Sequence, residues 1–304
     1  MTINISRAAL LIPFFATVGC ASGTIDDTFE QGGEQVGETA QEVVTSNRLT
    51  MNRLTMNRLT MNSLSATKLS PNGQQLSATT LADTEDGREV LRYLVRCALP
   101  DGASLTATVS GTTYVFPGLL GLASNWMQGP LTGTGRRWIT ACLLAHVNGY
   151  GVQVPISVRG NHPSLTADNS ERTSYGVQEV SFFGDIFASD DGDGSAAVPM
   201  YACGGQSQQV ACGSSGSNFW PARSCANAAD CEIQFLGACK DMSGANAHVC
   251  GSVLQDGYSK CHTAAKSSFG FWPYGQTYNE VITVYMAPAD FNAFYTSCAP
   301  LASQ

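Results

Sequence analysis

The sequence is poor in charge. Lysine, arginine, aspartate and glutamate make up 13% of its 304 residues, and the formal net charge is −8. This acidic balance argues against nucleic acid as a partner, because domains that bind nucleic acid carry an excess of basic side chains. A low charged fraction, together with 31 glycines and a 43% hydrophobic share, is typical of an exported protein that can still form a core.

A hydrophobic run long enough to cross a bilayer is also absent. The N-terminal run Ala8–Val18 has about half of the roughly 20 residues that a membrane span needs, and Pro13 interrupts it. With a basic residue before it and small residues after it, this run predicts a secretory signal peptide. Cys20 resembles the cysteine of a bacterial lipobox, which is diacylated and becomes the new N-terminus. The alternative is ordinary cleavage after Gly23, and any membrane attachment must come from the lipid.

Spacings that bind zinc are absent as well. A zinc site needs paired short spacings such as Cys-x2-Cys. The nearest approach combines Cys225 and Cys231 with the pair Cys261-His262, which matches no standard spacing. Since disulfides form and persist in oxidising compartments, we expect these cysteines to form disulfides rather than to bind a metal.

One acidic turn offers the kind of ligand that calcium uses. Asp190, Asp191 and Asp193 stand beside two glycines, and hard carboxylate oxygens on a bendable loop suit Ca²⁺. However, no acid stands where an EF-hand loop would place its bidentate glutamate. A solvated acidic turn and a weak calcium loop both stay open, and no other cofactor is expected.

A serine-hydrolase motif is not complete. The nearest match to Gly-x-Ser-x-Gly is the run Gly213–Gly216, which is one residue too short and lies in a cysteine-rich stretch. The residue types of a triad are nevertheless present. The candidates for its nucleophile and base are Ser214, Ser215, His248 and His262. The acids that could serve glycoside hydrolysis instead lie near the most strand-like segment and are Glu171, Glu179 and Asp185.

What the sequence does have is cysteine. Of the eleven, Cys20 stands alone near the N-terminus and ten fall within the later part of the chain. An even number in an exported chain predicts five disulfides, and the lipid anchor then accounts for the odd Cys20. The ten are Cys97, Cys142, Cys203, Cys212, Cys225, Cys231, Cys239, Cys250, Cys261 and Cys298.

Two of the ten are expected to pair with each other. Cys97 and Cys142 each fall on the apolar stripe of a predicted helix, at 84–97 and 137–148, so packing of the two stripes would bring them together. Closing this loop of roughly 45 residues would stabilise the fold by about 4 kcal/mol in the chain-entropy model. His146 lies beside the stripe and is expected to be a packed core residue. The connectivity of the other eight is open, because about 105 arrangements exist.

The clearest internal repeat precedes the globular part. The pentapeptide Asn-Arg-Leu-Thr-Met occurs three times, from Asn47, Asn52 and Asn57, and then decays. Its leucines recur every five residues, a step that places them on one side of neither an α-helix nor a strand. Because its repeat is five residues long, the segment resembles pentapeptide-repeat solenoids. Three interpretations stay open: a spacer, a short solenoid rung docked on the domain, or a stripe of arginines that touches anionic envelope polymer or lipid headgroups.

The whole pattern predicts one disulfide-rich α+β domain, with a few helices and antiparallel strands, after a disordered or repeat stalk. We divide the chain into a signal peptide (1–20), an acidic disordered linker (21–46), the repeat (47–70), a second linker (71–82) and a cysteine-rich globular domain (83–304). The strands expected in that domain are 105–109, 113–117, 152–159, 175–187 and 280–286. The stretch 201–262 has almost no periodicity and is expected to depend on its disulfides.

Aromatic residues give a modest binding signal. Several of them stand among Gly, Ser and Pro rather than on a periodic face, where exposed rings would stack on a sugar or peptide. The alternative is that they fill a small core between disulfides. The candidates for such a platform are Trp220, Trp272 and Tyr274.

The lipobox-like start, the repeat, the segment Arg136–Asn148 and the cysteine-rich second half together resemble uncharacterised exported cysteine-rich lipoproteins of large-genome Gram-negative bacteria. The resemblance implies an outer-membrane or cell-surface location, with a periplasmic or secreted protein as the alternative, and implies no activity. We therefore expect a lipoprotein anchored in a membrane through Cys20, whose domain binds a surface glycan or protein or serves structurally. The alternative function is a secreted hydrolase that acts on polymers.

Overall fold

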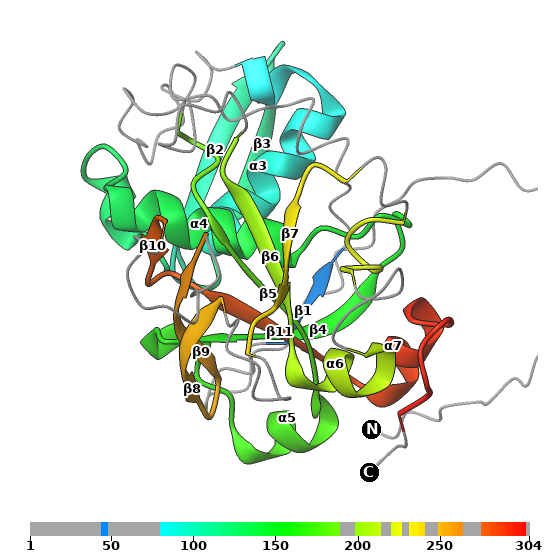
Figure 1. The fold of residues 1–304 in the computed structure, drawn as a ribbon. Helices are drawn as coiled ribbons and strands as arrows, with labels where there is room; N and C mark the ends of the chain where they lie inside the picture. The colour runs from blue at the N-terminus through cyan, green and yellow to red at the C-terminus, as the bar shows by residue number, and fades with distance from the viewer. Residues whose placement is uncertain are drawn as a thin grey trace, which may run out of the picture. The chain divides into compact units, whose positions relative to one another are not determined.

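The computed structural model describes residues 44–47, 80–188, 198–213, 220–226, 231–240, 249–263 and 275–301. These residues form the expected α+β fold, with helices, mostly antiparallel strands and several disulfides (Figure 1). No helix within these ranges is both long enough and apolar enough to span a membrane.

A six-stranded sheet organises the domain (Figure 1). Neighbouring strands run antiparallel except β6 and β7, which are parallel. The strand that comes last in the chain, β11, lies in the middle of the sheet between β4 and β5. In sheet order the strands are β1 (Val44–Asn47), β4 (Val154–Gly160), β11 (Ile282–Met286), β5 (Val177–Gly184), β6 (Met200–Gly204) and β7 (Gln234–Ala238).

Helices cover one face of this sheet. Helices α3 (Glu85–Ala98) and α4 (Gly133–Ala145) pack against each other, and α4 lies against β5 and β11. Because side chains alternate between the two faces of a strand, every second residue of β4 and β11 enters the core beneath the helices. We call this apolar cluster the main core. The residues that enter it from these two strands are Val154, Ile156, Val158, Ile282, Val284 and Met286.

Side-chain caps fix where the helices begin. The Thr84 hydroxyl accepts the Gly87 N–H at the start of α3, and the Thr132 hydroxyl accepts the Gly135 N–H at the start of α4. Helix α4 therefore begins four residues before the predicted 137 and ends at Ala145 rather than at 148. The other helices are η2 (Thr80–Asp83), η3 (Ser124–Met127), η4 (Pro163–Leu165), α5 (Asn169–Ser174), α6 (Gln206–Cys212) and α7 (Pro288–Phe294).

A three-stranded sheet lies against the opposite face. It consists of β8 (Cys250–Leu254), β9 (Gly257–His262) and β10 (Thr277–Tyr278), and β9 contacts β4, β5 and β11. Gly257 has φ +111° and lies so close to the Thr283 side chain that a Cβ would collide with it. Glycine thus lets this hairpin approach the main sheet. The second core between them is formed by Phe183, Tyr201, Cys203, Cys239, Val249, Cys250, Tyr258, Cys261, Tyr278 and Val281.

A separate hairpin packs on α3. Its strands β2 (Ser104–Val109) and β3 (Thr112–Pro117) lie within a residue of the predicted bounds. They are joined by Ser110 and Gly111, which both have positive φ, at 50° and 84°. This two-residue turn matches the right-handed twist of the strands that it connects.

Candidate functional site

All ten cysteines of the domain are joined in disulfides. The expected bridge between α3 and α4, Cys97–Cys142, is present, so packing of the two helical stripes does bring these residues together. The four bridges that the sequence leaves open are Cys203–Cys239, Cys212–Cys298, Cys225–Cys231 and Cys250–Cys261. The nearest approach to a zinc motif, Cys225 and Cys231 with Cys261, is therefore occupied by sulfur–sulfur bonds.

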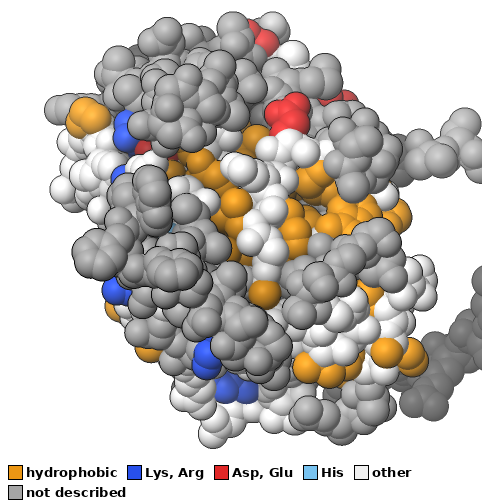
Figure 2. Space-filling model, in the orientation of Figure 1, with side chains coloured by type: hydrophobic (Ala, Val, Ile, Leu, Met, Phe, Trp, Pro, Cys, Tyr) orange, Lys and Arg blue, Asp and Glu red, His pale blue; other side chains and the backbone are white. Residues whose placement is uncertain are grey.

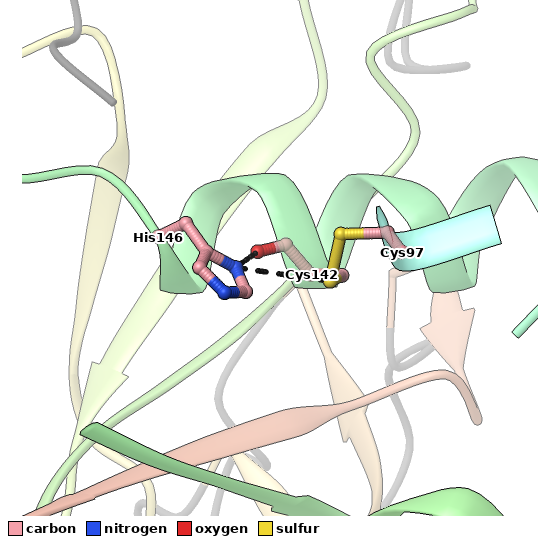
Figure 3. A group of neighbouring side chains, drawn as sticks. All are labelled: Cys97, Cys142 and His146. Carbon is pink, nitrogen blue, oxygen red and sulfur yellow. Dashed lines mark hydrogen bonds between the residues drawn. A yellow bond between two sulfur atoms is a disulfide. The ribbon is translucent and has the colours of Figure 1, made fainter. Parts of the chain in front are cut away.

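His146 lies beside the first of these bridges, at the C-terminal end of α4 (Figure 3). Its Nδ1 is 2.7 Å from the Cys142 carbonyl oxygen and 3.8 Å from Cys142 Sγ. A carbonyl only accepts, so Nδ1 carries a proton and donates it to this oxygen. Burial lowers the pKa of His146 to about 3, and the nearby Arg96 and Arg223 act in the same direction.

The chemistry of this group does not suit a metal ion. Cys97, Cys142 and His146 lie close enough together to share an ion. However, metal binding needs thiolates and an unprotonated ring nitrogen. Both sulfurs are joined to each other, and the nitrogen nearest to them carries the proton. His146 also packs on Tyr93, with ring centroids 5.3 Å apart, so the group is part of the buried structure.

A second sulfur cluster lies in the core under the hairpin. Cys203 Sγ is 3.3 Å from Cys250 Sγ, although each is bonded to a different partner. Four buried sulfur atoms from β6, β8, β9 and the end of β7 thus meet in one place. One bridge joins β6 to the end of β7 within the main sheet, and the other joins β8 to β9 within the hairpin. A thiolate formed at Cys250 would lie within reach of the Cys203–Cys239 bond.

A fully buried ion pair lies on the helix side of the sheet. Arg223 Nε donates to both carboxylate oxygens of Glu179, at 3.0 Å each, and neither side chain is exposed. Tyr295 donates its hydroxyl to the same carboxylate at 2.8 Å, and Arg223 Nη1 donates to the Val147 carbonyl at 2.6 Å. These bonds join β5, α7 and the end of α4 to the segment 220–226. They satisfy the charge of Glu179, which is what a buried carboxylate requires.

Another polar cluster lies on the hairpin side, beneath α5. Ser157 donates to Glu171 Oε1 and accepts a hydrogen bond of 2.7 Å from Arg159 Nε. The Arg159 guanidinium also donates to the carbonyls of Glu171 and Tyr175 and lies 3.9 Å from the centroid of the Tyr285 ring. Burial raises the pKa of Tyr285 to about 12, so its phenol stays neutral. The Ser157 hydroxyl is buried and fully engaged, so it is not placed as a nucleophile.

At the rim of this cluster an ion pair reaches the surface. Arg172 of α5 donates through Nε and Nη2 to the two carboxylate oxygens of Asp256, at 3.1 and 2.9 Å. This fork-to-fork geometry attaches α5 to the turn between β8 and β9. The Asp256 carboxylate is thus engaged with a cation.

The glycosidase candidates are placed in three different clusters. Glu171 contacts Ser157 on the hairpin side, whereas Glu179 contacts Arg223 on the helix side. Asp185 forms an ion pair of 3.0 Å with Arg136 at the first turn of α4. Burial raises the pKa of Asp185 above its ordinary value, although Arg136 opposes this effect.

Two of the remaining candidates lie in described parts of the chain. His262 Nδ1 lies 2.9 Å from the Thr277 hydroxyl, in the ladder between β9 and β10. Trp220 is half-buried and packs against the main core. The candidates that lie outside the described residues are Cys20, Asp190, Asp191, Asp193, Ser214, Ser215, His248, Trp272 and Tyr274.

Sequence reasoning did not find the Arg223–Glu179–Tyr295 cluster. Its acid and base are 44 residues apart, and a bulge in β5 separates Glu179 from the register of its neighbours. The sequence signal for this cluster is Arg223, a single arginine among small residues and cysteines in a chain with few charges. Burial of such a residue requires a partner.

Charged side chains are scattered on the described part of the face in Figure 2, and hydrophobic side chains gather near its centre.

No protein-family model, curated protein or solved structure matches the chain. The fold and the disulfides are therefore the basis for any statement about function.

Proposed function

We propose that the protein is an exported lipoprotein of the cell envelope, anchored by acylated Cys20, whose disulfide-bonded domain binds a surface glycan or protein or serves structurally. The observation that carries the proposal is the pairing of all ten cysteines between Cys97 and Cys298. Five disulfides belong to an oxidising compartment, since cytosolic reductants keep thiols reduced. The pairing leaves Cys20 as the one cysteine without a partner in the domain, which is what a lipid-modified residue would be.

A binding or structural role is supported by the way the buried polar groups are used. Glu179 is neutralised by Arg223, Glu171 accepts from Ser157, and each contact joins separate elements of the fold. Catalytic acids and bases are instead poised toward a substrate, with pKa values tuned for proton transfer. A partner that presents hydroxyl or amide groups suits a chain with 13% charged residues and a net charge of −8 better than a polyanion does.

Lipidation is tested in a Gram-negative host fed with an alkyne fatty acid. We expect the full chain to incorporate the label and to enter the detergent phase of a Triton X-114 separation. Cys20→Ser should lose both properties, whereas Ser22→Ala, two residues away, should keep them. A wild-type protein that is unlabelled and begins at Thr24 would overturn the anchor and indicate ordinary cleavage.

Enzymatic activity is tested separately on the purified protein. Chromogenic esters, peptides and glycosides should give no turnover above that of a reduced and unfolded sample. Turnover that one substitution abolishes would overturn the non-enzymatic role and leave the anchor unaffected.

A further inference from the structure

Exposed hydrophobic side chains gather at one end of the main sheet. Five large hydrophobic residues of the described chain are exposed, and three of them, Tyr150, Val152 and Val210, belong to segments at this end. Tyr150 and Val152 precede β4, and Val210 lies on α6, which follows β6. The strand registers bring together the start of β4, the end of β11, the start of β5 and the end of β6, so these segments leave the sheet at the same end.

Contacts join the segments that carry these side chains. The Tyr150 ring lies 5.2 Å from the Phe294 ring of α7, measured between centroids. The disulfide Cys212–Cys298 joins the end of α6 to the chain that follows α7. Tyr150 is held in place because its N–H donates to Oδ1 of Asn148 at 2.9 Å. We call this surface the apolar end, and its residues are Tyr150, Val152, Val210 and Phe294.

The same segments are almost free of charge. Residues 147–158, 198–213 and 281–301 contain one charged residue, Asp290, in a chain in which 13% of residues are charged. On the hairpin side of this end α5 carries the ion pair Arg172–Asp256, so the uncharged surface lies on the helix side. Figure 2 shows hydrophobic side chains at the lower right, where Figure 1 places α6 and α7. The net charge of −8 is thus carried by other parts of the chain.

We propose that the apolar end rests on the surface of a lipid bilayer, with its two rings and two valines at the level of the headgroups. This inference deepens the proposed function and rests on the lipid anchor, which holds the domain at a membrane. The chain between Cys20 and Val44 spans about 80 Å when it is fully extended. The anchor therefore does not select which surface of the domain meets the membrane, and the apolar end makes that selection.

Charge and side-chain chemistry both favour lipid as the occupant. Anionic headgroups attract basic segments, so they repel an acidic surface, and the apolar end brings no such repulsion. Tyrosine is enriched at the boundary between hydrocarbon and water, where binding strength scales with the apolar area that is buried. A sugar would find few hydrogen-bond partners at this surface, because Val152, Val210 and Phe294 have no polar side-chain atoms.

Photo-labelling from the lipid tests the orientation of the full lipidated chain. The vesicles contain phosphatidylethanolamine, phosphatidylglycerol and a phospholipid with a diazirine near its headgroup. We expect adducts on the segments that carry Tyr150, Val210 and Phe294. Val115 is the matched control, because it is 60% exposed and lies on β3, far from α6 and α7 in Figure 1. Adducts as frequent at Val115 as at Val210 would overturn the proposal.

Vesicle binding without the lipid separates this surface from the anchor. Residues 21–304 without an acyl chain contain every described residue, so their sedimentation with the same vesicles measures what the domain contributes. Val152→Asp combined with Val210→Asp should lower the partition coefficient about tenfold, because two valines lose apolar contact and gain charge. Val115→Asp should leave it unchanged. All three positions are exposed, so equal free energies of unfolding confirm that the variants fold.

The failures of the two proposals are distinguishable. If residues 21–304 do not bind vesicles, or if the double variant and Val115→Asp behave alike, the apolar end does not dock on lipid, whereas fatty-acid labelling of Cys20 is unaffected. If Cys20 is not acylated but residues 21–304 bind and the double variant does not, the anchor falls and the docking surface stands.

Ionic strength and oligomeric state exclude the other occupants. Raising NaCl from about 50 to about 500 mM should not release residues 21–304 from the vesicles, because salt screens charge interactions and leaves apolar contact in place. Release at high salt would overturn apolar docking. A dimer whose fraction rises with protein concentration, and which Val210→Asp abolishes, would assign the surface to a second copy of the chain and overturn lipid as the occupant.

Discussion

The two faces of the main sheet are held by different interactions. Under α3 and α4 the core is broad and apolar, with the Cys97–Cys142 disulfide in it, two further disulfides at its edge and one fully buried ion pair, Arg223–Glu179. Under the β8–β9 hairpin the core is small and consists mainly of aromatic rings and two touching disulfides. The hairpin face also carries polar side chains that point to α5 and to the β8–β9 turn.

The two faces differ in how much apolar surface each layer buries. A broad apolar layer stabilises itself through burial, at about 25 cal/mol per Å². A three-stranded sheet of short strands buries less, so it depends more on the Cys250–Cys261 bridge within it and on its contacts with the larger layer. We therefore expect perturbations of the helix face to act on the whole domain and perturbations of the hairpin face to act locally.

The largest expected effect is on the helix face. Arg223→Met should lower the free energy of unfolding by about 3–5 kcal/mol, because Glu179 would remain buried without its cation. Arg172→Met, which breaks the rim pair with Asp256 on the hairpin face, should cost about 1 kcal/mol or less. Chemical denaturation of both variants measures this contrast. If the two variants lose the same free energy of unfolding, the buried pair does not stabilise the helix face more than the rim pair stabilises the hairpin face.

A smaller effect is expected from the sulfur cluster. Cys261→Ser opens a bridge between residues 11 apart in sequence, which contributes about 3 kcal/mol in the chain-entropy model. The Cys250 thiolate can then attack Cys203, which forms a Cys203–Cys250 bond and releases Cys239 as a thiolate. Alkylation and peptide mapping should therefore find the free thiol on both Cys250 and Cys239.

The control for this exchange is Cys142→Ser. This substitution frees the Cys97 thiol. The group in which Cys97 lies, with Cys142 and His146, holds no second disulfide that this thiol could attack, so the free thiol should stay on Cys97. A free thiol confined to Cys250 in the first variant would contradict the exchange. Hydrogen exchange should show lost protection in β8–β10 for Cys261→Ser and in the helices for Cys142→Ser.

The most gradual effect is a dependence on pH that belongs to the helix face, because it develops over several pH units. Burial lowers the pKa of His146 to about 3, from the ordinary 6.5 of an unfolded chain. Between these values the unfolded state binds a proton that the folded state does not, so stability falls as the pH falls. The loss is about 1.4 kcal/mol per pH unit below about pH 6.

The measurement is the free energy of unfolding at a series of pH values. His146→Asn can retain an N–H donor toward the Cys142 carbonyl and has no group that titrates in this range, so it should flatten the slope between about pH 6 and 4. A slope that is the same in the variant and the wild type would assign the acid sensitivity to other groups.

The sequence predicts elements well where local signals agree with packing. The apolar stripes of the two predicted helices and the cysteine on each stripe correctly predict α3, α4 and the bridge between them. The turn at Gly111 correctly predicts the β2–β3 hairpin. The signal for each of these elements lies in one short window, and the bridge follows from the packing of two such elements.

The second half is harder to predict because its elements are short and their contacts are distant. Strands β6 to β9 have five or six residues each, and their apolar residues are interrupted by Gly, Ser and Cys. Their places are set by pairing with strands far away in the chain and by four disulfides whose connectivity no spacing specifies. The polar clusters follow from this topology, so they could not be predicted before it was known.

The central position of β11 constrains biosynthesis. Because the chain is synthesised from its N-terminus, β4 and β5 are complete well before β11, which alone joins them. Until then the main core lacks Ile282, Val284 and Met286, and the sheet is divided into two parts. Nine of the ten domain cysteines emerge before Cys298, so oxidation begins on an unfinished sheet. We therefore expect thiol–disulfide exchange to continue until β11 has joined the sheet.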